Sequence, residues 1–60
     1  MTEPEYYAAV RAFGLRASRF AETFFTVNGE AVSVPLARDL TPEARRETID
    51  RLRGRLGVEP

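Results

Sequence analysis

Alternating apolar and polar residues on either side of Asn28-Gly29 predict a β-hairpin in the middle of the chain. Asn-Gly is the preferred dipeptide of two-residue hairpin turns, because both central residues of such a turn take positive φ values. The hairpin is expected over about residues 20–36. A two-residue turn places Val27 opposite Glu30, whereas a bulged turn would slip this register and exchange the faces of one strand.

With this turn, the alternation divides the strand residues between two faces. One face carries Ala21, Thr23, Phe25, Val27, Val32, Val34 and Leu36. The other carries Phe20, Glu22, Phe24, Thr26, Ala31 and Ser33. If Phe25 faces the helices, Phe20 and Phe24 form an exposed aromatic patch, which is typical of an interaction site. The alternative is that helices cover both faces, or that one Phe lies under the second helix.

Capping signals and apolar periodicity predict a first helix over about residues 3–13. Thr2 and Glu5 have the spacing of a capping box, in which each residue satisfies a backbone N–H of the other. One helical face carries Tyr6, Val10 and Phe13. Gly14 is expected to end the helix in the left-handed conformation, with Leu15 folding back onto the helix.

A second helix is predicted over about residues 42–56. Thr41 is a favourable N-cap, and Pro42 suits the first helical position, where no N–H is needed. A narrow apolar stripe consists of Ile49, Leu52 and Leu56. Gly57 is expected to end this helix, with Val58 folding back onto it.

These elements predict one small domain over residues 1–60, of the α+β class, with both helices covering one face of the hairpin. A domain of this size buries only about 60% of the surface that its unfolded chain exposes. The chain has no Cys for disulfides and no His for a typical structural zinc site. Oligomerisation is the remaining source of stability, so we expect a homodimer. It would form either by joining two hairpins into one sheet or by packing the Phe-bearing faces.

Charge and composition narrow the function classes. Nine basic and nine acidic residues balance, so no overall field attracts nucleic acid or a membrane surface. Every basic residue is Arg, which, with the many Ala residues, is typical of a GC-rich bacterial or phage genome. Because His, Cys and Lys are absent, the usual general bases and nucleophiles are missing. We therefore expect no enzyme, no catalytic, metal or cofactor site, and a cytoplasmic location without a membrane span.

The second helix carries five Arg against three acidic residues, a local excess of two positive charges. Arg46, Arg53 and Arg55 are candidate contacts to nucleic-acid phosphates. Arg45 falls inside the apolar stripe and Arg53 flanks it. Either their stems cover apolar surface while the charged ends reach water, or the stripe faces a partner that carries acids.

The candidate interaction surface predicted from these patterns comprises Phe20, Phe24, Arg45 and Arg53. The leading functional expectation is a dimeric, non-enzymatic protein-interaction or adaptor module of a bacterial or phage system. Its protein partner is unknown from the sequence. The alternative is a weak nucleic-acid-binding or regulatory protein that uses the Arg-rich second helix.

Overall fold

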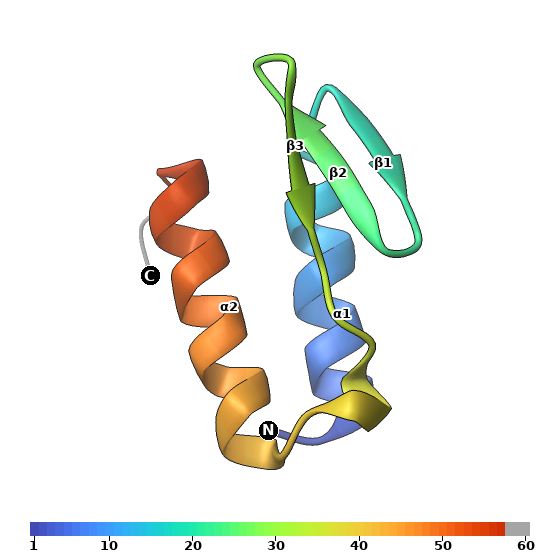
Figure 1. Ribbon diagram of the computed structural model, residues 1–60, viewed down its shortest axis with the longest axis vertical. Coiled ribbons are helices and arrows are strands. Elements are labelled where there is room, and N and C mark those ends of the chain that lie inside the picture. The colour runs from blue at the N-terminus through green and yellow to red at the C-terminus, as the bar shows by residue number, and fades with distance from the viewer. Residues whose placement is uncertain (58–60) are drawn as a thin grey trace.

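The computed structural model describes residues 1–57, apart from the side chain of Leu56, and confirms the predicted α+β class. The elements in chain order are α1 (Glu3–Gly14), β1 (Arg19–Ala21), β2 (Phe24–Val27), β3 (Glu30–Ser33), the short 3-10 helix η1 (Ala37–Asp39) and α2 (Pro42–Leu56). The strands form one antiparallel sheet in the order β1-β2-β3. In Figure 1, α1 lies behind this sheet, and α2 stands on the β3 side.

The caps of both helices form as their sequences indicate. Glu5 N–H donates to Thr2 Oγ1 at 3.3 Å, and Thr2 N–H donates to Glu5 Oε1 at 2.8 Å. The second of these bonds stabilises the charged carboxylate and, with help from the Thr2 side chain, lowers the pKa of Glu5. In α2, Ala44 N–H donates to Thr41 Oγ1 at 3.1 Å, and Gly57 ends the helix in the left-handed conformation with φ of 69°. Val58 lies outside the described residues, so its expected return onto α2 stays a prediction.

The turn at Asn28-Gly29 has the predicted two-residue form. Their φ values of 53° and 83° are those of a type I′ turn, in which both central residues are left-handed. Val27 pairs with Glu30, which confirms the unbulged register. The next inward pair, Phe25 and Val32, therefore points at the core.

The strand before this turn is not continuous, and this changes the predicted faces. The chain reverses at Glu22-Thr23, so that Phe20 lies opposite Phe25 in the β1–β2 pair. Directly opposed residues share a face, so Phe20 lies on the inner face with Phe25. The prediction that Phe20 shares a face with Phe24 was wrong, because simple alternation does not continue through a turn. The reversal adds a third strand, which gives a more stable sheet than an isolated hairpin.

The core lies between the inner face of the sheet and the two helices. Its buried apolar side chains are Tyr6, Val10, Phe13, Phe25, Val32, Val34, Ala37, Ile49 and Leu52. Tyr6 is fully buried, and its hydroxyl donates to the Pro35 carbonyl at 2.6 Å, so the ring's polar end is satisfied. Burial raises the pKa of Tyr6, with a smaller effect from Tyr7. The Tyr6 hydroxyl thus ties the segment after β3 to α1.

Gly14 serves a different purpose from the one predicted. It lies within α1 and outside the set of residues with positive φ, so it is not a left-handed cap. A Cβ added at Gly14 would lie 2.5 Å from Cδ2 of Phe20. Glycine is needed here because the Phe20 ring rests directly on the helix backbone. Leu15 is 88% exposed, so the prediction that it folds back onto α1 was also wrong. The chain instead leaves the helix through an Arg16 N–H to Phe13 carbonyl bond at 2.9 Å.

Two glycines with open space around them provide a matched test of the turn. We expect Gly29→Ala to lower the free energy of unfolding by about 1–2 kcal/mol, since its φ of 83° is unfavourable for an L-residue. We expect Gly54→Ala to raise that free energy by up to about 1 kcal/mol, because alanine is the better helix former. A Cβ at either position meets nothing within 4 Å, so packing cannot explain a difference. Urea unfolding followed by circular dichroism measures both values; equal effects would contradict the assigned turn.

The contact between Gly14 and Phe20 is open to a double-mutant cycle. Gly14→Ala is expected to lower the free energy of unfolding by about 1–3 kcal/mol, because the added methyl displaces the Phe20 ring. In a Phe20→Ala background the same change is expected to cost little, since nothing remains to be displaced. A cost that is equal in both backgrounds would show that the ring is not the obstacle.

Candidate interaction surfaces

The outer face of the sheet, on the side away from the core, is not covered by either helix. Figure 1 shows the sheet in front of α1, with no element in front of the sheet. The ladder pairs Phe24 with Ala21 on one side and Ser33 on the other, and pairs Thr26 with Ala31. Phe24 is 40% exposed, its direct ladder partners are small, and Arg19, which pairs with Thr26, lies on the same face. The result is an uncovered face with one aromatic ring on the middle strand, at the end where β2 begins.

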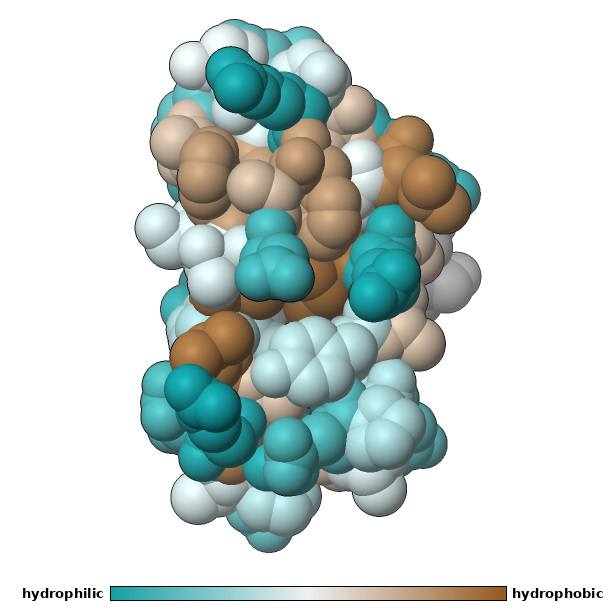
Figure 2. Space-filling view, turned by 90° about the vertical axis from the view of Figure 1, so that its right-hand side faces the viewer, coloured by the Kyte–Doolittle hydropathy of each residue, from teal (hydrophilic) through white to brown (hydrophobic). Residues whose placement is uncertain are grey.

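Phe20 belongs to a separate surface on the β1 side of the molecule. Its ring is 44% exposed and borders a groove of about 510 Å³ lined by Tyr7, Val10, Arg11, Phe20, Glu22 and Leu36. Figure 2 shows this side, with hydrophobic surface gathered in its upper half and a hollow below it. The two exposed Phe side chains predicted as one patch therefore lie on opposite faces of the sheet.

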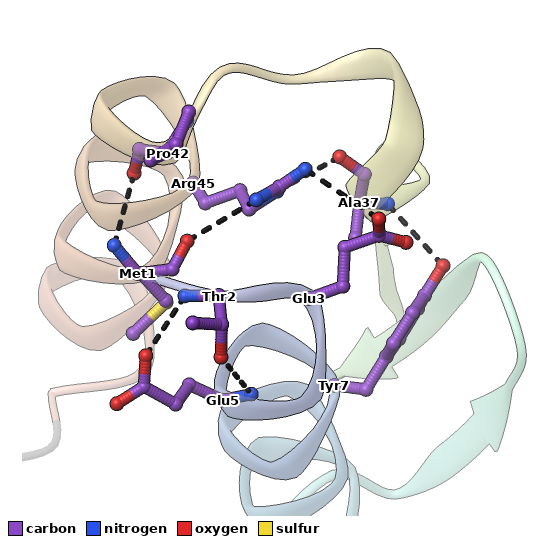
Figure 3. A network of polar contacts seen from close by, with 8 residues as sticks. All are labelled: Met1, Thr2, Glu3, Glu5, Tyr7, Ala37, Pro42 and Arg45. Atoms are coloured by element: carbon purple, nitrogen blue, oxygen red, sulfur yellow. Dashed lines mark hydrogen bonds and ion pairs between the residues drawn. The ribbon is translucent and has the colours of Figure 1, made fainter.

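Arg45 makes its contacts within the chain (Figure 3). Its Nε donates to the Ala37 carbonyl at 2.9 Å, and its Nη1 donates to the Met1 carbonyl at 3.2 Å. Glu3 lies 3.9 Å from Nη2, and the Arg45 side chain is only 12% exposed. On the same segment, Ala37 N–H donates to Tyr7 Oη at 3.3 Å. Arg45 thus joins α2 to η1 and to the start of α1, instead of presenting its charge to a partner.

The three candidate phosphate contacts on α2 do not form one basic surface. Arg46 and Arg53 are seven residues apart and share a helix face, whereas Arg55 projects from nearly the opposite side. Arg53 Nη1 lies 3.0 Å from Asp50 Oδ1. Arg55 pairs with Glu30 on β3. Two of the three guanidinium groups are therefore already matched by carboxylates.

A second groove, of about 420 Å³, separates β3 from α2. Its lining consists of Ala31, Val32, Ser33, Pro35, Thr48, Arg51, Leu52 and Arg55. This groove was not predicted from the sequence, because it forms between segments that are distant in the chain. Arg51 was part of the Arg excess noted in the sequence, but nothing local placed it opposite a strand edge.

The surfaces offer an aromatic ring, guanidinium groups and backbone donors and acceptors, which are suited to binding. Among residues 1–57, no cluster of three His, Cys, Asp or Glu side chains is placed to hold a metal ion. Within the same part of the chain, no helix has the length and hydrophobicity needed to cross a membrane.

Comparison with known proteins does not add a family or a fold relative. No family model matches the chain, and no curated protein or solved structure is detectably similar to it.

The contacts of Arg45 predict that its substitution lowers the free energy of unfolding much more than substitution of the neighbouring Arg46. Arg45→Met keeps an apolar stem but removes the donors to the Ala37 and Met1 carbonyls. We expect it to lower the free energy of unfolding by about 1–3 kcal/mol, because the Met1 carbonyl loses its donor and the Ala37 carbonyl keeps only the Leu40 N–H. Arg46→Met, at the next and exposed position, should change that free energy by no more than about 0.5 kcal/mol. Similar values for the two variants in urea unfolding would exclude this role of Arg45.

Proposed function

We propose that this chain is a small non-enzymatic protein-interaction module that pairs with a second copy through the outer face of its sheet. The observation that carries the proposal is the 40% exposure of Phe24 on the middle strand of a sheet face that no helix covers. Its setting is a bacterial or phage cytoplasm, in keeping with the Arg-only, Ala-rich composition.

The physical gain from pairing would be large for a chain of this length. A 60-residue domain buries a small fraction of its surface, so each additional buried aromatic residue matters. Burying a whole Phe removes roughly 150–250 Å² of surface from water, and about two fifths of that is left to bury at Phe24 in each copy, because the residue is 40% exposed. Two outer faces related by a twofold axis would place Phe24 of each copy among the small side chains of the other. Ala21, Ala31 and Ser33 leave room for that ring.

The Arg-rich helix provides weaker support for nucleic-acid binding. Phosphate contacts need guanidinium groups that are free to replace counterions. Arg53 and Arg55 pair with Asp50 and Glu30, and the third candidate, Arg46, lies on a different side of α2 from Arg55. We therefore keep nucleic-acid binding only as an outcome of the experiment below.

Light scattering during size-exclusion chromatography tests the proposed pairing. At tens of micromolar, an order of magnitude typical of modest protein affinities, the chain should have about twice its single-chain mass. Phe24→Ser should return it to the single-chain mass with an unchanged circular dichroism spectrum. Leu15→Ser is the matched control, because Leu15 is also apolar and is 88% exposed away from the sheet. It should leave the mass unchanged.

Three results would overturn the proposal. The first is a wild-type chain that is monomeric at these concentrations, and the second is a Phe24→Ser variant that keeps the dimer mass. The third is binding of duplex or single-stranded nucleic acid at low salt that is lost when Arg46, Arg53 and Arg55 are replaced together by Ala. That third result would favour the nucleic-acid function instead.

A further inference from the structure

The free edge of β3 presents unpaired backbone groups to the groove beside α2. Val27 pairs with Glu30 across the tight turn, and Phe25 pairs with Val32 two residues further on. Val34 N–H continues the same series by donating to the Thr23 carbonyl at 2.6 Å. In an antiparallel ladder, the intervening residues direct their N–H and C=O groups away from the partner strand.

The intervening residues on β3 are Ala31 and Ser33, and both line the 420 Å³ groove. Their N–H and C=O groups have the spacing that another strand needs for pairing. Pro35, which has no N–H, lies where β3 ends and limits the exposed edge to this short stretch. The edge is therefore a short, defined template for one added strand.

The ionic side chains that line the groove are both cationic. Arg51 and Arg55 project into it from α2, and Leu52 supplies apolar surface between them. Arg55 reaches across to the carboxylate of Glu30 on β3, which shows that a guanidinium of α2 can pair with an acid held at the strand. Among the described residues, no carboxylate lies within ion-pair distance of Arg51. A ligand with an acidic side chain would complete this arrangement.

We propose that the groove between β3 and α2 binds an extended acidic segment of a partner protein, which pairs with β3 as a fourth strand. The Ala31 and Ser33 backbone groups would supply the main-chain hydrogen bonds, and Arg51 would bind the acidic side chain. An added strand would lie about 4.8 Å from β3, the usual spacing between neighbouring strands. A second folded copy fits less well, because its own α2 flanks the same edge. The groove shares Ala31 and Ser33 with the outer face, but the added strand would use their backbone groups and the side chain of Arg51 on α2, whereas self-association would use their side chains and Phe24.

A charge-swap experiment tests the proposal. The probe is a short fluorescein-labelled peptide that alternates valine and glutamate, with a valine–lysine peptide as the control, and binding is measured by fluorescence anisotropy. We expect the wild-type chain to prefer the glutamate peptide. Arg51→Glu should weaken binding of that peptide by at least about tenfold and improve binding of the lysine peptide. Arg46→Glu, which makes the same charge change on α2 outside the groove, should leave both affinities unchanged.

The strand-pairing part of the proposal has its own measurements. Ser33→Pro removes an N–H that faces the groove without removing a bond to β2, and it should weaken peptide binding by about fivefold. Saturating peptide should slow hydrogen exchange at the amides of Ala31 and Ser33. Phe24→Ser should leave peptide affinity unchanged even if it dissociates the dimer, which separates failure of this proposal from failure of self-association.

Three outcomes would each overturn the proposal. The first is equal binding of the lysine and glutamate peptides to the wild-type chain. The second is a loss of affinity in Arg46→Glu as large as the loss in Arg51→Glu. The third is an unchanged exchange rate at the amides of Ala31 and Ser33 when peptide is added.

Discussion

The register set by the Asn28-Gly29 turn is the constraint on which the rest of the molecule depends. It places Phe25 and Val32 in the core and leaves Phe24 on the outer face. A slip of one residue in either strand would move that strand's apolar side chains to the opposite face. The same register directs the backbone groups of β3 toward α2. Core, outer face and groove are therefore three consequences of one backbone geometry.

The attachment of α2 combines a narrow apolar contact with a polar one. Ile49 and Leu52 enter the core, but few other apolar side chains of α2 are buried in the described structure. Arg45 adds hydrogen bonds to carbonyls of Ala37 and Met1, which belong to segments far from it in sequence. The Arg45 side chain therefore both donates to those carbonyls and fixes the position of α2. This explains why a charged residue occupies a place in the apolar stripe.

The helix caps and the hairpin turn could be predicted from the sequence, because each depends on residues that are close together in the chain. The capping box of Thr2 and Glu5, the turn at Asn28-Gly29 and the end of α2 at Gly57 depend only on neighbouring residues. The reversal before β2 was not predicted, because it carries no Gly or Pro and is stabilised by pairing with a third strand. Of the candidate site residues, Phe24 was placed correctly on an exposed face. The partners of Arg45 and the groove beside Arg51 were not foreseen, since both depend on contacts between distant segments.

The contact between the Phe20 ring and the backbone of Gly14 also constrains how this sequence can change over evolutionary time. Gly14 has no side chain, and the Phe20 ring leaves no room for one at that position. A substitution at position 14 alone therefore gives a less stable protein, unless position 20 already carries a smaller residue. In any lineage that keeps this fold, the two positions should co-vary, and a glycine at the end of α1 should accompany an aromatic residue on β1.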